Sequence, residues 1–288
     1  LHHHGVVPSR IHGFGARRKI QRTGNSRIQG SVHRLEIPLQ REQIHEKTSA
    51  FDVVTEADEA AERAIAAGLR AAFPGADVVG EEATGRDPTL LDLLGSSALV
   101  FVVDPLDGTK NFASGLPLFG VMVAVVALGE VVAGVIHDPV GQTTACALRG
   151  QGAWLLAPDG QRTPLRVAAP QAVKQMHGIV STNFVPEPLR TQVNARLSSL
   201  ATTNWFRCAA HEYRLAAAGH VDVLFYNKLM PWDHAAGWLL HQEAGGYSAH
   251  FDGSPYRPTH TTGGLLCAPD RASWAAVHRA LLGDASPS

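Results

Sequence analysis

The sequence contains little cysteine, few aromatic residues and almost no net charge. Its three cysteines, Cys146, Cys208 and Cys267, lie far apart, so neither a zinc-ligand pair nor a disulfide framework is indicated, and we expect a reducing, cytoplasmic compartment. The longest apolar run, residues 119–128, falls well short of the roughly 20 residues that a transmembrane helix needs. These absences exclude a disulfide-rich domain and predict no membrane partner.

The net charge of the whole chain is close to zero, but the charges are unevenly distributed along the sequence. With 25 Lys and Arg against 26 Asp and Glu, the net charge of −1 excludes a globally basic nucleic-acid-binding protein. Residues 1–47 nevertheless hold nine basic residues and three glutamates, so the rest of the chain is acidic. Residues 1–46 lack periodicity and predict a basic, flexible arm, which is interpreted either as a polyanion-binding tail or as a segment foreign to the fold, such as a tag remnant.

Regular patterns begin after this arm. Thr55 and Asp58 resemble a capping box, and small apolar residues then recur at helical spacing until Pro74-Gly75, which predicts a helix. Strand patterns follow, and Gly129-Glu130 is the expected hairpin turn between the third and the fourth of them. These patterns cover 77–79, 99–103, 120–128, 131–137 and 143–148.

Beyond Pro164, strand and helix patterns alternate. The strand patterns cover 178–181, 221–226, 247–250 and 265–268. The helical patterns cover 187–200, 209–218, 233–244 and 271–282. We therefore predict an α/β (α+β) fold in two halves, 47–165 and 166–288, with a soft boundary near 164–170.

Acidic residues follow two of the predicted strands. Glu81 comes after the strand at 77–79, and Asp104 and Asp107 follow the strand at 99–103, which Pro105 is expected to end. Carboxylates about 4 Å apart repel by roughly 4 kcal/mol per pair at an effective dielectric constant near 20. Such a cluster needs cations, and oxygen ligands without nearby Cys or His favour Mg²⁺ or Mn²⁺ over zinc.

Each acid taken singly has an ordinary structural explanation. Asp107-Gly108 is a common turn pair, Asp58 suits a helix cap, and Asp233, at the start of a predicted helix, complements the helix dipole. Their joint occurrence favours a metal site instead, with Asp233 as a further candidate ligand.

Four motifs together resemble the inositol monophosphatase family of metal-dependent, lithium-sensitive phosphatases. They occur in the family's order from about Lys47 to the end of the chain: Asp52-Val53-Val54-Thr55-Glu56-Ala57-Asp58, Gly80-Glu81-Glu82, Asp104-Pro105-Leu106-Asp107-Gly108-Thr109 with Asn111-Phe112, and Trp232-Asp233 with Glu243-Ala244-Gly245-Gly246. The resemblance implies a layered αβαβα sandwich of the inositol monophosphatase and fructose-1,6-bisphosphatase type, with the site between its halves.

The resemblance also implies roles for these residues. Glu81, Asp104 and the Leu106 carbonyl oxygen would hold one metal ion, Asp104, Asp107 and Asp233 would hold a second, and a third would share Glu81. Thr109, oriented by Asp58, would act with Glu81 in taking a proton from the attacking water. Asp107, Gly108 and Thr109 would contact the substrate, with the N–H groups of the last two around the phosphate.

The sequence differs from similar enzymes in the substrate pocket. Tyr226 stands where inositol-phosphate enzymes have a Glu that binds ring hydroxyls, and Arg207-Cys208-Ala209-Ala210 replaces a Gly-Thr-Ala-Ala-like stretch. We expect Tyr226 and Ala209 to line the pocket. Arg207 either binds a second phosphate or carboxylate of the substrate or is a structural arginine. His234 is expected to pack on its helix rather than to bind metal.

The predicted function is a Mg²⁺-dependent phosphomonoesterase whose partner is a small phosphorylated metabolite such as inositol monophosphate, and Mn²⁺ is an alternative ion. Histidinol phosphate, fructose bisphosphate and nucleotide 3′-phosphates are alternative substrates. The alternative of another class is a catalytically silent scaffold or RNA-associated protein that uses the basic arm. No nucleic-acid partner is expected for the leading hypothesis, and similar proteins are commonly homodimers.

Overall fold

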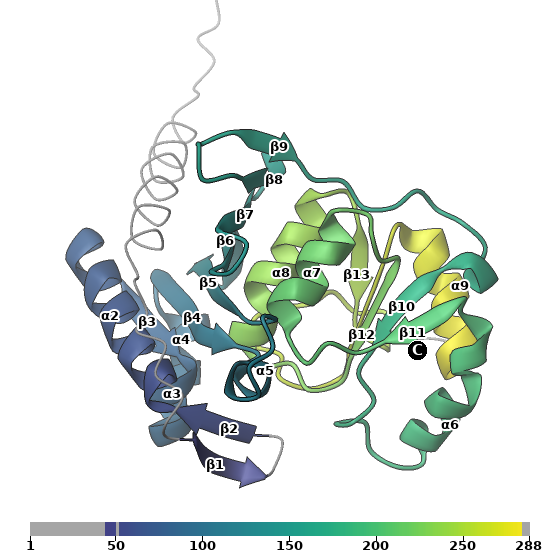
Figure 1. Ribbon diagram of the computed structural model, residues 1–288, viewed down its shortest axis with the longest axis horizontal. Helices are drawn as coiled ribbons and strands as arrows, with labels where there is room; N and C mark the ends of the chain where they lie inside the picture. Colours follow the sequence, from purple (N-terminus) through teal and green to yellow (C-terminus); the bar gives the residue numbers. More distant parts are fainter. Residues whose placement is uncertain (1–43, 50–51, 284–288) are drawn as a thin grey trace, which may run out of the picture.

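The computed structural model describes residues 44–49 and 52–283, which fold into five alternating layers (Figure 1). Helix α2 (Glu56–Ala72) covers the outer face of a seven-stranded sheet, α7 (Ala209–Ala217) and α8 (Pro231–Glu243) lie between this sheet and a five-stranded one, and α6 (Leu189–Arg196) and α9 (Arg271–Leu282) cover the far side. The predicted αβαβα sandwich is therefore confirmed.

The larger sheet has the strand order β3-β4-β5-β6-β7-β8-β9. Strands β3 and β4 are parallel, and every later neighbouring pair is antiparallel. The strands are β3 (Asp77–Gly80), β4 (Leu99–Asp107), β5 (Gly120–Ala127), β6 (Glu130–Asp138), β7 (Thr143–Leu148), β8 (Gly152–Leu156) and β9 (Arg162–Pro164). Three short helices adjoin these two strands: α3 (Glu81–Arg86) follows β3, α4 (Leu93–Ser96) precedes β4, and α5 (Thr109–Ala113) follows β4.

The smaller sheet has the order β11-β10-β12-β14-β13. Strands β10 (His177–Val180), β11 (Thr202–Asn204) and β12 (Val223–Tyr226) are parallel, and β14 (Leu265–Ala268) is antiparallel to both of its neighbours, β12 and β13 (Tyr247–Ala249). Parallel strands end at one edge of a sheet, so the segments that follow β11 and β12 emerge together. These segments lead into α7 and α8, the two helices of the middle layer.

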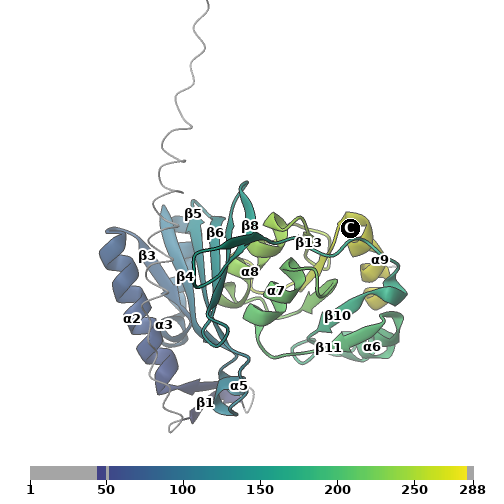
Figure 2. The same ribbon diagram turned by 45° about the horizontal axis from the view of Figure 1, so that its top comes forward.

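A separate ribbon pairs β1 (Ile44–Ser49) with β2 (Asp52–Thr55) and lies beside α5 (Figures 1 and 2). Strand β1 begins within the predicted arm, so the expectation that residues up to 46 lack regular structure is wrong for 44–46. Residues 1–43 of that arm lie outside the described residues.

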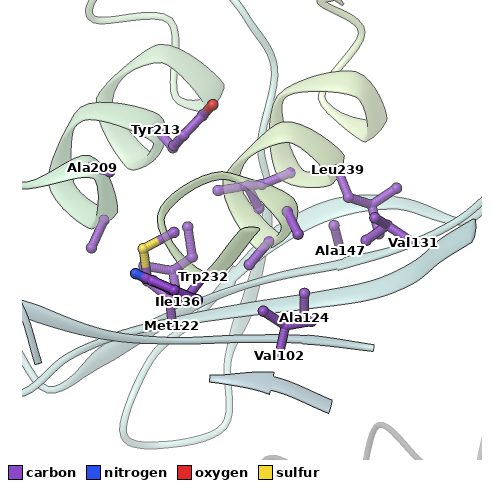
Figure 3. Close-up of a cluster of buried hydrophobic side chains, with 14 of the residues drawn as sticks. Val102, Met122, Ala124, Val131, Ile136, Ala147, Ala209, Tyr213, Trp232 and Leu239 are labelled. Atoms are coloured by element: carbon purple, nitrogen blue, oxygen red, sulfur yellow. The ribbon is translucent and has the colours of Figure 1, made fainter. Parts of the chain in front are cut away.

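The central strand β5 is apolar throughout because both of its faces are buried. Met122 and Ala124 belong to the cluster that Trp232 of α8 joins (Figure 3), whereas Val123 packs in a second cluster with Leu69 of α2. Alternate residues of a strand face opposite sides of its sheet, so a strand between two helical layers needs apolar residues at every position. The long apolar run is therefore the centre of the sheet.

The hairpin after β5 turns one residue earlier than predicted. Leu128 and Gly129 are its two central residues, with φ of 52° and 77°, and Glu130 already belongs to β6. Two positive φ values are the mark of the tight turns whose twist matches that of the flanking strands. The predicted turn at Gly129-Glu130 was wrong because it placed only one residue, the glycine, at a positive φ.

The other predicted elements are present with small shifts at their ends. The predicted helix at 187–200 is shorter, since α6 ends at Arg196 and a 3₁₀ turn, Leu197–Ser199, follows it. Strands β8, β9 and β11 were not predicted. No helix within the described ranges is both long enough and apolar enough to cross a bilayer.

Gly237 allows α8 to pack closely on α7. A Cβ added at this position would overlap the ring of Tyr213, which is fully buried, whereas one added at Gly68 of α2 would meet no atom within 4 Å. We expect Gly237→Ala to lower the free energy of unfolding by about 1–3 kcal/mol through overpacking. Gly68→Ala should raise it by about 0.5–1 kcal/mol, because alanine is the better helix former. Urea denaturation measures both, and two changes of the same sign would contradict this packing.

Candidate active site

The two aspartates that follow the 99–103 pattern lie within β4 itself. Pairing with β5 runs from Asp104, opposite Met122, to Asp107, opposite Gly120, so β4 carries one extra residue between these pairs. Pro105 therefore does not end the strand, as was expected, but lies in a β-bulge, where a missing N–H is tolerated. In a regular strand, residues three apart face opposite sides. The bulge removes this alternation and turns both carboxylates toward one site.

The third carboxylate comes from the other half of the sequence. Asp233 lies in the first turn of α8, which begins shortly after β12. One oxygen atom each of Asp104, Asp107 and Asp233 lies within 4.8 Å of the other two. Across residues 56–283, no other three His, Cys, Asp or Glu side chains come this close together. The acids that the sequence singled out at Asp104, Asp107 and Asp233 thus meet at one point.

Burial and mutual repulsion raise the pKa values of two of these acids, Asp104 and Asp107. Asp104 is 1% exposed, and burial, followed by repulsion from Glu81 and other carboxylates, holds its pKa well above the usual range. Burial raises the pKa of Asp107 to about 7, even though hydrogen bonds from Ala210 and Cys208 act to lower it. A group that holds several carboxylates against their repulsion calls for a cation, and its all-oxygen donor set fits Mg²⁺ or Mn²⁺.

Glu81 is the first residue of α3 and lies near this group. It is half-buried, and its charge raises the pKa of both Asp104 and Asp107. It is not one of the three acids whose oxygens lie within 4.8 Å of one another. Its assignments as metal ligand and as base stay predictions.

A buried glutamate that the sequence analysis missed holds the start of α3. Glu62 of α2 is 5% exposed, and its carboxylate accepts the N–H of Glu82 at 2.7 Å and that of Ala83 at 2.8 Å. The first N–H groups of a helix have no partner within it, so Glu62 caps α3. A Cβ at Gly80 would overlap this carboxylate. The sequence did offer a signal for Glu62: it lies four residues after Asp58, so the two side chains share one face of the helix.

The Thr109 hydroxyl lies between two acceptors. Its Oγ1 is 2.9 Å from Asp58 Oδ1 and 3.0 Å from the carbonyl oxygen of Leu106. Asp58 therefore reaches Thr109, whereas the Thr55 side chain of the expected capping box lies outside the described side chains. Gly108 has φ of 85°, and a Cβ there would lie 2.8 Å from the Leu118 carbonyl oxygen, so this turn requires glycine.

Residues 206–210, which belong to the second half of the chain, contact Asp107 directly. The Ala210 N–H donates to Asp107 Oδ2 at 2.5 Å, and the Cys208 thiol donates to the same oxygen at 3.2 Å. Ala209 is buried at the first position of α7. Arg207 is half-buried with φ of 56°, and none of the ion pairs in the described part of the chain includes it. This arginine keeps the possibility of pairing with a ligand.

Two further residues that the sequence analysis singled out, Tyr226 and His234, have partners inside the protein. The Tyr226 hydroxyl donates to Glu212 Oε2 at 2.8 Å, and both residues are buried. The role of Tyr226 in substrate binding stays a prediction, but its hydroxyl already donates its hydrogen bond to Glu212. His234 lies 2.9 Å from the Lys228 carbonyl oxygen and 3.1 Å from the Tyr213 hydroxyl, and burial lowers its pKa to about 4. It packs within the middle layer, as expected.

Comparison with known proteins places these residues in a family. The sequence profile of the inositol monophosphatase family matches residues 18–285. The chain belongs to the inositol monophosphatase family. The match begins inside the predicted basic arm, so family similarity extends beyond the resemblance read from Lys47 onward.

Relatives within the inositol monophosphatase family have more than one name. The chain is 36% identical to the Nus factor SuhB of Pseudomonas aeruginosa over 81% of this chain and 83% of that protein. It is 31% identical to the fructose-1,6-bisphosphatase/inositol-1-monophosphatase of Thermotoga maritima, over 73% of this chain and 76% of the relative. The crystal structure of the extragenic suppressor protein suhB from Bartonella henselae superposes with a TM-score of 0.73 at 27% identity, covering 93% and 98% of the two chains.

Metal binding at this centre is expected to weaken as the pH falls below about 7. The raised pKa of Asp107 means that protons compete with the cation for the carboxylate. Isothermal titration with Mg²⁺ should show an affinity that falls between about pH 8 and about pH 6, with release of protons on binding. An affinity independent of pH over this range would contradict the assignment.

The same shift predicts a pH-dependent stability without metal. The folded protein binds the Asp107 proton more tightly than the unfolded chain does, so ionisation destabilises the fold between the ordinary pKa of 3.8 and about 7. Relative to Asp107→Asn, the wild type should therefore lose stability with rising pH in this window, by up to about 1.4 kcal/mol per pH unit. Chemical denaturation of both proteins in chelator measures the difference.

Proposed function

We propose that this chain is a Mg²⁺-dependent phosphomonoesterase that hydrolyses a small polyol phosphate such as inositol monophosphate, with Mn²⁺ as an alternative ion. The observation that carries the proposal is the meeting of Asp104, Asp107 and Asp233 oxygens within 4.8 Å, in a protein of this family. Clustered carboxylates repel a phosphate ester. Divalent cations among them would offset the local negative charge and admit it.

The chain's own residues would hold these cations. Glu81, Asp104 and the Leu106 carbonyl would bind one ion, and Asp107 and Asp233 would share Asp104 with the second. Bound there, divalent ions polarise the phosphoryl group, stabilise the leaving oxygen and lower the pKa of water. Because α8 carries Asp233 and β4 carries Asp104, closure of the site depends on the packing of the middle layer on the larger sheet.

Thr109 is the residue best placed to handle the proton of the attacking water. When its hydroxyl donates to Asp58, at 2.9 Å, a lone pair of the Thr109 oxygen can accept a hydrogen bond from the attacking water and orient it. Glu81 would serve as the base that takes the proton of this water. The left-handed turn at Gly108 starts α5, and the N–H groups of Gly108 and Thr109 would bind the phosphate there.

Arg207 bears on the choice of substrate. The half-buried Arg207, without an ion pair in the described residues, favours a substrate with a second anionic group. Fructose bisphosphate has such a group, and histidinol phosphate and nucleotide 3′-phosphates are further alternative substrates. The name of the Thermotoga maritima relative includes both fructose-1,6-bisphosphatase and inositol-1-monophosphatase.

A second candidate function belongs to another class. Relatives more than 30% identical are named Nus factor SuhB, which supports a catalytically silent scaffold or RNA-associated role. The acids at the centre argue for catalysis, since core packing alone favours apolar residues at Asp104 and its neighbours. The two candidates differ in whether phosphate is released.

Phosphate release should require Mg²⁺ and decrease with lithium. A panel of inositol, fructose, histidinol and nucleotide phosphates tests the wild type, and Asp104→Asn should lose more than about 100-fold in kcat/KM, because it removes a charged metal ligand. Asp159→Asn, in an exposed turn, is the control and should keep the wild-type rate. Full activity in Asp104→Asn would overturn the mechanism, and a wild type inactive on the whole panel would favour the scaffold.

The hydroxyl of Thr109 can be tested by shape-matched variants. Thr109→Val preserves the branched shape without the hydroxyl and should lower kcat by about 100- to 10,000-fold, the usual contribution of positioned proton transfer. Thr109→Ser keeps the hydroxyl and should retain most of the activity. Equal rates for the valine and serine variants, measured at saturating Mg²⁺, would remove Thr109 from the proton path.

A further inference from the structure

A buried carboxylate outside the predicted site holds the segment that reaches Asp107. Glu212 of α7 is 1% exposed, and it accepts the Phe206 N–H at 3.0 Å and the Tyr226 hydroxyl at 2.8 Å. The peptide N–H groups of Arg207 and Cys208 also stabilise its charged form. Burial nevertheless raises the pKa of Glu212 to about 7. These donors offset part of the cost of removing the carboxylate from water.

The segment that Glu212 holds has an unfavourable backbone. Arg207 has φ of 56°, a left-handed conformation that is unfavourable for a non-glycine residue and persists only where its surroundings fix it. The Phe206 carbonyl is fixed from the other side, since Asn111 donates to it at 2.7 Å. Glu212 and Asn111 thus hold this segment between α5 and α7.

The same segment sets the position of Asp107. Immediately after Arg207, the Cys208 thiol and the Ala210 N–H both donate to Asp107 Oδ2. A shift of residues 206–208 would therefore move or release one oxygen of a carboxylate that lies in the three-acid group. Glu212 itself is not in that group and can act on it only through these residues.

We propose that Glu212 is a positioning residue for the metal centre. With Tyr226 as its partner, it holds residues 206–208 so that Cys208 and Ala210 orient Asp107 toward Asp104 and Asp233. The inference rests on the proposed function in one respect, that this centre binds a divalent cation. It also gives the tyrosine at position 226 a structural role, since its hydroxyl completes the donor set of a buried acid.

Glutamine should not replace Glu212 in this role. A carboxylate has two oxygen atoms with about four acceptor positions, whereas an amide has a single acceptor oxygen and introduces donors. With the Phe206 N–H on Oε1 and the Tyr226 hydroxyl on Oε2, Glu212→Gln leaves one of these donors facing an NH₂ group. The segment is then expected to move away, although the side chain keeps its size.

Glu243 provides a matched control. Its carboxylate also accepts two peptide N–H groups, those of Gly150 at 2.7 Å and Gly152 at 2.8 Å, in the turn between β7 and β8. That turn carries none of the residues assigned to the centre. Glu243→Gln therefore disturbs the same kind of contact, at a place where loop movement should not reach Asp107.

The test compares Mg²⁺ binding and turnover in the full-length protein. Glu212→Gln should bind Mg²⁺ about 10- to 100-fold more weakly by isothermal titration, the usual effect of removing a group that orients a metal ligand. Its kcat/KM should fall in proportion at limiting Mg²⁺ and recover in large part at saturating Mg²⁺, which a general loss of folding would not allow. Glu243→Gln should keep the wild-type Mg²⁺ affinity and kcat/KM, even if its melting temperature falls.

Wild-type Mg²⁺ affinity in Glu212→Gln, or an equal loss in Glu243→Gln, would overturn the inference. If Glu212→Gln does not fold, Tyr226→Phe decides the question, because it removes one donor from Glu212 without burying a new polar group. Its Mg²⁺ affinity should also fall, and an unchanged value would again overturn the inference. The titration needs no turnover, so a wild type that binds Mg²⁺ but releases no phosphate would refute only the proposed function.

Discussion

Repulsion among buried carboxylates is the constraint on which the rest of the site depends. Asp104 is almost fully buried and lies near four other acids, all of which raise its pKa. At an effective dielectric constant near 20, each pair at about 4 Å costs roughly 4 kcal/mol, more than an exposed ion pair contributes. Apolar packing of α8 on the larger sheet must hold Asp233 against this repulsion. A cation would offset the repulsion, so the arrangement of carboxylates is most stable with a cation bound.

Carboxylates outside the three-acid group stabilise the segments that carry the site. Glu62 caps the helix that starts at Glu81, Asp58 accepts the Thr109 hydroxyl, and Glu212 holds residues 206–208. All three are buried, and each accepts protein donors. Buried acids are stable when N–H and O–H groups satisfy them, and they then fix the donors in return. The rigidity of the site therefore depends on polar contacts within apolar layers.

Local patterns predicted most of the helices and strands and singled out the three acids that meet, but they failed where the contact partner is distant. Helix α9 begins after Asp270 as predicted, because capping depends on neighbouring residues, here the Ser273 N–H. The bulge at Pro105 was missed because it is defined by pairing with β5. Glu62 and Glu212 resemble surface glutamates in sequence, since their burial depends on other elements of the fold.

By itself, the sequence determined most of the helices and strands, the α/β class and the acids available to a metal. Hydrogen bonding along the backbone and the periodicity of apolar residues are local, so these properties can be read from neighbouring positions. Only the tertiary structure decided which atoms meet: Asp233 with the aspartates of β4, and Tyr226 with Glu212. Such contacts depend on how α7 and α8 pack between the two sheets, and no spacing along the chain encodes that packing.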